Sequence, residues 1–183
     1  MDVLTHLIPQ TEQVEVVYLN HEATTVGFEA SRLKTSKVEE TAGVAVRVVK
    51  NGQLGFAASS DLTATDKLVR NVLESTAYGD KVSLTFPGPQ PGPKVRTFDA
   101  AIADLPVTRM VEIGLEVIAY LREIDSDVLL DVTLNRGINQ ATIRNHAGAD
   151  VAFKRSPFSL SIELHRVKGD DILIMADMIG TTV

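Results

Sequence analysis

The sequence contains no cysteine, and this absence excludes disulfide bonds, thiolate zinc sites and cysteine nucleophiles from the chain. Its first residues, "MDVLTHLIPQTEQ", lack the basic segment and the long apolar core of a signal peptide. No run of about 18 apolar residues occurs, so no membrane-spanning helix is predicted. Together these absences predict a soluble cytoplasmic protein with no membrane partner.

Positive charge is also scarce, because 18 Lys and Arg residues stand against 24 Asp and Glu residues, for a net charge of -6. A chain with this balance has no general attraction for a phosphate backbone, so nucleic acid is not an expected partner. Two short basic clusters, residues 32–34 and 154–155, are interpreted as solvated strand edges. The 183 residues, 44% of them hydrophobic, can bury the core of one globular domain or of two small joined lobes.

The clearest local pattern surrounds Asn51-Gly52. Side chains alternate with a period of two on both sides of this pair, in residues 44–49 and 54–59. An Asn-Gly pair tolerates the positive φ angles of a type I′ turn. The pattern therefore predicts a β-hairpin.

The remaining periodicities predict an α+β fold: an antiparallel meander with a crossing helix, followed by a second helix and mainly antiparallel strands. Thr63 is the expected N-cap of the crossing helix, with Asp66 three residues later as an acidic capping box. The second helix is expected at residues 107–124 and to be buried on two sides. A short first helix is expected at residues 2–7, the four meander strands at residues 14–19, 24–30, 38–49 and 54–59, and later strands at residues 128–134, 138–145, 149–153 and 158–165.

The segment "FPGPQPGPK", residues 86–94, holds four of the seven prolines. It predicts a Pro/Gly-rich join between a sheet-and-helix lobe at residues 1–85 and a second helix-and-strand lobe at residues 95–183. A phosphate-binding loop is the alternative interpretation. It is disfavoured because such loops lead directly into a helix N-terminus.

The histidines do not form a metal motif. His21-Glu22 begins like a zinc-protease motif, but Thr25 and Val26 stand where a second histidine is required, one helical turn later. The pair is interpreted as part of a turn or strand edge. The other histidines lie in unrelated segments without ligand spacing, at His6, His146 and His165.

Other catalytic patterns are missing as well. Asp125, Asp127 and Asp131 lie close together, but they lack the glycine turn and the closing glutamate of a calcium loop. No nucleophile elbow, P-loop or dinucleotide fingerprint occurs. The residues alone therefore predict no catalytic, cofactor-binding or metal-binding site in this chain and favour a binding or structural module.

The hairpin region, "TAGVAVRVVKNGQLGFAASSDLT", resembles the N-terminal region of the TldD/PmbA family, peptidases once described as modulators of DNA gyrase. In that family a G-x-x-V-R-V…(N/D)-G-x-x-G-F-A hairpin precedes a Ser/Thr-Asp-Leu helix start. The matching residues are Gly43, Val46, Arg47, Val48, Asn51, Gly52, Gly55, Phe56, Ala57, Asp61 and Leu62. Two further similar segments follow in family order, "TFDAAIADLPVTRMVEIGLEVI" and "RNHAGADVAFKRSPFSLSIEL", and in the second Asn145 and Gly148 are similar to an N-S-x-G turn. The resemblance extends over residues 14–163.

The resemblance implies a function. Similar proteins are zinc-dependent peptidases that act as homo- or heterodimers and enclose the metal site in a cavity. Their His-Glu-x-x-x-His helix lies in a C-terminal domain, and nothing in this sequence matches it. By resemblance, the chain is the non-catalytic N-terminal domain, inactive alone, that helps to form the peptide-holding cavity and the dimer, with zinc expected in the missing C-terminal domain.

Two alternatives remain open. A free-standing binding module derived from this family, without enzymatic activity, would present sheet edges to a partner. DNA regulation, which the older family name suggests, is opposed by the net charge. The apolar run "DILIMADMIGTTV", residues 171–183, adds the expectation that the natural chain continues past Val183 and covers these side chains.

Overall fold

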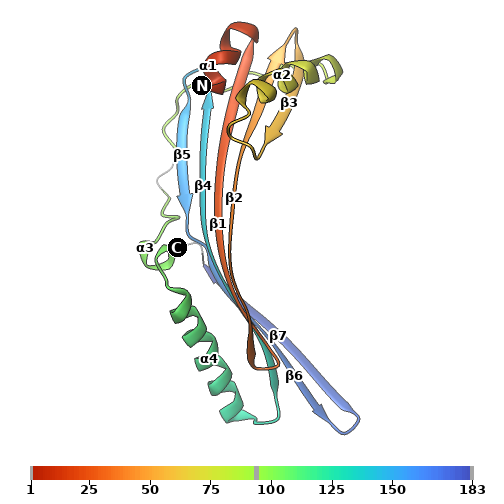
Figure 1. Cartoon of the computed structure of the whole chain (residues 1–183), viewed down its shortest axis with the longest axis vertical. Coiled ribbons are helices and arrows are strands. Elements are labelled where there is room, and N and C mark those ends of the chain that lie inside the picture. The colour runs from red at the N-terminus through yellow and green to blue at the C-terminus, as the bar shows by residue number, and fades with distance from the viewer. Residues whose placement is uncertain (1, 93–94, 182–183) are drawn as a thin grey trace. The chain divides into compact units, whose positions relative to one another are not determined.

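The computed structural model describes residues 2–92 and 95–181, so that Pro93 and Lys94 of the predicted join lie outside the described residues. Within that part, seven strands form one sheet in the order β3-β2-β1-β4-β6-β7, with β5 paired to β4. The β2–β3, β4–β6 and β6–β7 pairs are antiparallel, and the α+β class is confirmed. The elements, shown in Figure 1, are α1 (Val3–Leu7), β1 (Gln13–Glu29), β2 (Arg32–Lys50), β3 (Gln53–Ser59), α2 (Thr65–Ser75), α3 (Ala100–Ala103), α4 (Val107–Ile124), β4 (Leu129–Asn145), β5 (Asp150–Arg155), β6 (Phe158–Lys168) and β7 (Asp171–Thr181).

The chain divides into two compact units built from interleaved segments. β1, β2 and β4 each contribute residues to both units. The domain limits inferred from the Pro/Gly-rich join stay a prediction. The first unit contains Met1–His21, Thr41–Val95 and Gln140–Phe153, and the second contains Glu22–Glu40, Arg96–Asn139 and Lys154–Val183.

In the first unit, α1 and α2 share one core with the sheet. Leu68, Val69 and Val72 recur at helical spacing on α2, so that this helix has one apolar face, and that face is buried. Val46 and Val48 of β2 belong to the same core. Burial of these aliphatic side chains is the main favourable contribution to the stability of the unit.

In the second unit, α4 covers one face of the sheet. Its bounds confirm the predicted helix, and Met110, Gly114 and Ile118 form its buried face at i, i+4 and i+8. Gly114 allows a close approach, because a Cβ atom there would lie 2.2 Å from Phe28 Cε2. Among the described residues, no helix is both long and apolar enough to cross a membrane.

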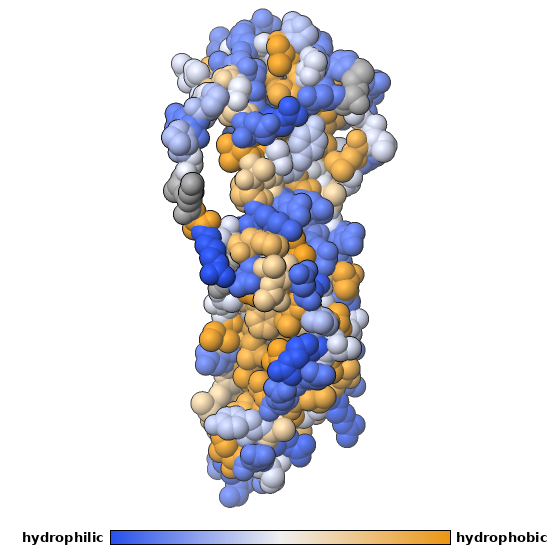
Figure 2. Space-filling view, turned by 90° about the vertical axis from the view of Figure 1, so that its left-hand side faces the viewer, coloured by the Kyte–Doolittle hydropathy of each residue, from blue (hydrophilic) through white to orange (hydrophobic). Residues whose placement is uncertain are grey.

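The predicted burial of α4 on two sides is wrong. Leu115, Tyr120 and Ile124 are 49%, 65% and 71% exposed. Figure 2 shows hydrophobic and hydrophilic side chains mixed over the surface on this side of the second unit. An apolar helix of this length can therefore lie on a sheet with only one face buried, because scattered exposed apolar side chains are common on protein surfaces.

The predicted meander is present, but its four-strand count is wrong, because its first two strands, residues 14–19 and 24–30, are one strand, β1. The turn to β2 lies at Ala30 and Ser31, where φ is +46° and +64°. Non-glycine residues rarely adopt these angles. Here the turn is held by a tertiary contact, since the Ser31 N–H donates to the Leu130 carbonyl at 2.7 Å.

Two other predicted strands, residues 128–134 and 138–145, are likewise joined into β4. The strand continues through Gly137, whose N–H donates to the Pro157 carbonyl at 2.8 Å. A Cβ atom at Gly137 would lie 3.1 Å from Pro157 Cγ. Here the glycine marks a close approach within the sheet instead of a turn.

The expected N-cap of α2 is wrong too. The helix begins at Thr65, and its N-cap residue, Ala64, makes no side-chain capping bond. The Thr63 hydroxyl donates instead to Asp61 Oδ1 at 2.6 Å, and the Thr63 N–H donates to the same atom at 2.9 Å. Both bonds stabilise the ionised carboxylate and so hold the pKa of Asp61 below its ordinary value, and the bond from the hydroxyl has the larger effect. The Asp-Leu-Thr segment is therefore a turn that precedes the helix.

Candidate functional site

The residues that resemble the family hairpin form a tight turn in the first unit. Asn51 and Gly52 have φ angles of +53° and +70°, and Lys50 pairs with Gln53, as the Asn-Gly pattern predicts. The Glu12 carboxylate accepts hydrogen bonds from the N–H groups of Asn51 and Gly52, at 2.8 and 3.2 Å. These contacts give the turn residues a structural role.

Gly55 of the same hairpin lets β3 approach α2. A Cβ atom at this position would lie 2.5 Å from Thr76 Cγ2 and 2.6 Å from the Val72 carbonyl oxygen. Beside it, the Phe56 N–H donates to Ser75 Oγ at 2.9 Å. The Gly-Phe pair therefore joins the hairpin to the helix that follows.

Arg47 lies on the opposite sheet face of the first unit. Its guanidinium pairs with Glu15, which is 8% exposed, and its central carbon lies 5.4 Å from the centre of the Phe86 ring. Phe86, the first residue of the predicted join, is buried, and its N–H donates to Gln13 Oε1 at 2.9 Å. This part of the join covers a charged pair on the sheet, so it is part of the core of the unit.

The turn similar to the N-S-x-G motif is present at the end of β4. Gly148 has a φ of +88° and its N–H donates to the Asn145 carbonyl at 3.2 Å. The buried Asn145 amide donates to the Pro87 carbonyl at 2.8 Å, and its Oδ1 accepts from the Ala149 N–H at 3.1 Å. Asn145 thus fixes both its own turn and the Pro-rich segment.

The donor side chains of the chain do not fit a zinc ion. His146 Nδ1 accepts a hydrogen bond from the Val14 N–H at 3.3 Å, and His21 lies within β1. Zinc sites in proteins use three or four closely placed nitrogen, sulfur or carboxylate ligands. Among the described residues, no three His, Asp or Glu side chains are placed to hold a metal ion.

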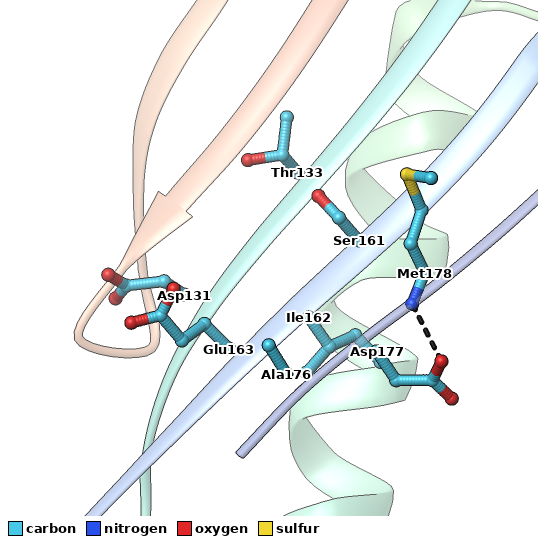
Figure 3. A pocket seen from close by; sticks show the side chains of 8 residues that line it. All are labelled: Asp131, Thr133, Ser161, Ile162, Glu163, Ala176, Asp177 and Met178. Atoms are coloured by element: carbon cyan, nitrogen blue, oxygen red, sulfur yellow. Dashed lines mark hydrogen bonds between the residues drawn. The ribbon is translucent and has the colours of Figure 1, made fainter. Parts of the chain in front are cut away.

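A hollow of about 460 Å³ lies on the open face of β4, β6 and β7 in the second unit (Figure 3). Alternation along β4 places Leu130 and Val132 in the core with α4, so that Asp131 and Thr133 face the other side. Figure 3 shows α4 behind the strands. The residues that line the hollow are Asp131, Thr133, Ser161, Ile162, Glu163, Ala176, Asp177 and Met178.

The register of the strands brings the polar groups together. Asp131 pairs with Glu163, and Thr133 pairs with Ser161, across β4 and β6. Two carboxylates directly opposite each other repel. The imidazole of His165 lies beside both carboxylates, with its Nε2 3.1 Å from Glu163 Oε1 and 3.8 Å from Asp131 Oδ2.

This arrangement can accept hydrogen bonds and attract cationic groups. A serine nucleophile needs a general base, most often a histidine, within hydrogen-bond reach of its hydroxyl. The nearest imidazole along β6, that of His165, contacts the two carboxylates Asp131 and Glu163 instead. The hollow therefore has the chemistry of a binding surface.

Part of this surface was predictable. The alternation predicted for β6 is confirmed, since Leu160, Ile162 and Leu164 pack against the core with α4. The sequence did not indicate that Thr133 and Met178 would lie beside Ser161 on the open face, because their positions depend on the register of β4–β6 and β6–β7.

Comparisons with known proteins give one family match over part of the chain and similar structures over nearly all of it. Residues 14–76 match the family described as PmbA/TldA metallopeptidase domain 1. TldE from Thermococcus kodakarensis has a similar structure, with a TM-score of 0.88 and 13% identity, over 99% of this chain and 42% of that one. No curated protein matches this chain by sequence.

Two proteins described as modulators of DNA gyrase are also similar in structure. The one from Thermotoga maritima gives a TM-score of 0.86 at 14% identity, over 98% of this chain and 42% of that one. The one from Bacteroides thetaiotaomicron gives a TM-score of 0.85 at 14% identity, over 98% of this chain and 43% of that one. At these identities the similarity shows the fold, and the chain spans less than half the length of each structure. With the match of residues 14–76 to a first domain, the chain has the fold of the N-terminal part of TldD/PmbA-like proteins.

Proposed function

We propose that this chain is the non-catalytic N-terminal part of a cytoplasmic, zinc-dependent peptidase or peptide-maturation protein, in which it helps to form the peptide-holding cavity and the dimer. The family match at residues 14–76 supports this role, together with a fold shared over nearly the whole chain. Zinc would be held by residues outside this chain, because no three donors among its described residues are placed to hold a metal ion.

The hollow on the open face of β4, β6 and β7 is the surface we assign to the peptide. An extended peptide presents N–H groups and side chains on alternating sides. The hydroxyls of Thr133 and Ser161 and the carboxylate of Glu163 can accept hydrogen bonds from such a chain. The hollow is the single structural observation that carries the proposal.

The test uses the full-length natural protein. Glu163→Gln removes an exposed negative charge that lines the hollow. We expect KM for a peptide to rise by about threefold or more with kcat and bound zinc unchanged, because a lost ground-state contact weakens binding without altering the chemical step. Glu39→Gln, at an exposed position on β2, is the matched control and should leave KM unchanged.

Two results would count against the proposal. An unchanged KM in Glu163→Gln would remove the hollow from the peptide path. A full-length protein that holds no zinc and cleaves no peptide would instead favour the binding module without enzymatic activity.

A further inference from the structure

The turn between β2 and β3 contains a chemically labile pair. Asn51 is the one asparagine in the sequence that is followed by glycine. Because Gly52 has no Cβ atom, its backbone nitrogen can approach the Asn51 side-chain amide without steric hindrance. This nitrogen can therefore act as a nucleophile toward Cγ of Asn51.

The pair lies at the surface of the first unit. Asn51 is exposed, and a Cβ atom added to Gly52 would meet no atom beyond its chain neighbours within 4 Å. Water can reach both residues from this side. Steric cover therefore does not protect the pair from hydrolysis.

Glu12 holds the backbone of the pair instead. Its two carboxylate oxygens accept one hydrogen bond each, from the N–H groups of Asn51 and Gly52, at 2.8 and 3.2 Å. Glu12 is itself fixed, because its N–H donates to the Val49 carbonyl at 2.9 Å. The Gly52 carbonyl accepts from the Val82 N–H at 2.9 Å, so both backbone groups of Gly52 are engaged.

This arrangement opposes reaction between the two residues. The Gly52 nitrogen must lose its proton and come within about 3.5 Å of Asn51 Cγ in an aligned geometry. In a type I′ turn this nitrogen points away from the Asn51 side chain. The peptide plane between the two residues must rotate before they can react, and that rotation breaks the bond from Gly52 to Glu12.

We propose that Asn51-Gly52 is a site of spontaneous deamidation and that Glu12 controls its rate. The Gly52 nitrogen gives its proton to water and attacks Asn51 Cγ, so that an N–C bond forms, the Cγ–Nδ2 bond breaks and ammonia leaves. Water then opens the resulting succinimide ring at either carbonyl. The products are aspartate or isoaspartate at position 51, and water is the only co-reactant.

Either product disturbs the turn. A carboxylate at position 51 would lie near that of Glu12, and like charges repel. Isoaspartate also adds a methylene group to the backbone, which does not fit a two-residue turn closed by Lys50 and Gln53. Since β3 packs on α2 through Gly55, the modification should loosen this helix as well.

Timed incubation of the full-length natural protein in mildly alkaline buffer tests the proposal, with mass mapping of the peptide that contains position 51. We expect Glu12→Ala to deamidate at least about tenfold faster than the parent, because opening of the turn no longer breaks two bonds to a charged group. Glu12→Gln should accelerate less, because its amide oxygen can still accept one bond. Glu39→Gln, at an exposed position on β2, is the control and should match the parent.

The same proteins unfolded in urea separate the effect of the fold from that of the sequence. All of them should then deamidate at one rate, because Glu12 no longer lies beside the pair. Hydrogen exchange in α2 reports whether Glu12→Ala keeps the fold of the first unit, and Glu12→Gln decides the comparison where it does not.

Three results overturn the proposal. Equal rates for the folded parent and the folded Glu12 variants overturn the protective role of Glu12. Slower rates in these variants overturn it as well, because the carboxylate would then assist the reaction by taking the Gly52 proton. An unfolded chain that keeps its amide at Asn51 overturns the site itself.

Discussion

The two units use their sheet faces differently. In the first unit both sheet faces have buried residues: Val16 lies in the core with α2, and the neighbouring Glu15 is buried on the opposite face beside Arg47 and Phe86. In the second unit α4 covers one face, while Glu163 on the other is exposed. The first unit has the structure of a scaffold, and the second carries the open face to which we assign the peptide.

This difference explains where the family pattern lies. The residues that resemble the TldD/PmbA hairpin belong to the first unit, and their contacts are turns and close approaches such as those of Gly52 and Gly55. Such contacts tolerate few residue types, so they leave a readable pattern in sequence. A binding face made of exposed side chains has no such constraint on its residue types.

The largest expected difference between the two units comes from substituting one glycine in each. Gly114→Ala places a Cβ atom 2.2 Å from the Phe28 ring, so we expect a loss of about 3 kcal/mol despite the better helix propensity of alanine. In this variant the amide hydrogens of α4 should show faster exchange before those of α2 do. Gly55→Ala, with a Cβ atom 2.5 Å from Thr76, should give the reverse order. Identical exchange patterns in the two variants would show that the units unfold as one.

One paired arginine in each unit provides a second contrast. The Arg136 side chain is 12% exposed, and its terminal nitrogens donate to the carbonyls of Ala103 and Leu105 and to Glu22 and Thr24, at 2.7 to 3.0 Å. Arg136→Met keeps the aliphatic volume but leaves these acceptors unpaired, so we expect a loss of about 2 to 3 kcal/mol.

The matched variant in the first unit is Arg47→Met, whose parent side chain is 48% exposed. Its loss should be smaller, about 1 kcal/mol, because solvent can replace part of the lost contact with Glu15. Urea unfolding of both variants measures the difference. A larger loss for Arg47→Met would indicate that the charged pair under Phe86 is a central contact of the fold.

The helix α4 and the Asn-Gly hairpin were predictable from sequence because their causes are local. The bounds of α4 follow from its apolar periodicity and from Pro106 before it. The Asn51-Gly52 turn follows from two residues that tolerate positive φ. In these cases neighbouring residues contain the whole physical reason.

The long strands and the hollow were not predictable, because their causes are tertiary. Ala30 and Ser31 adopt positive φ without glycine, and a bond from Ser31 to Leu130, far away in the chain, holds the turn. The hollow exists because Asp131 meets Glu163 in the β4–β6 register. From the sequence alone, Glu163 can be placed on the polar face of its strand. The residues that lie beside it on neighbouring strands cannot be identified without the register.

The Asn-Gly turn gives a smaller test of the scaffold. Gly52 has a φ of +70°, and a Cβ atom added there would meet no atom beyond its chain neighbours within 4 Å, so that a substitution is opposed by backbone strain alone. We expect Gly52→Val to cost about 1 kcal/mol or more and Gly52→Asn to cost less, because asparagine tolerates the left-handed region. Equal shifts of the unfolding midpoint would contradict this explanation.

The smallest expected effect concerns Asp61, at the entrance to α2. Bonds from the Thr63 hydroxyl and N–H hold the pKa of Asp61 below its ordinary value, so the folded state binds this proton less tightly than the unfolded state does. The stabilisation is therefore fully present above the unfolded pKa of about 4 and is lost as the pH falls through the lower folded pKa.

In Thr63→Val, an NMR titration of the Asp61 carboxyl carbon should show a pKa closer to the ordinary value, because the hydroxyl donor is gone. Exchange in α2 should then depend less on pH between about 4 and the folded pKa, while exchange in α4 should not change. A change of equal size in α4 would mean that this carboxylate stabilises more than its own unit, and the division between scaffold and binding surface would have to be redrawn.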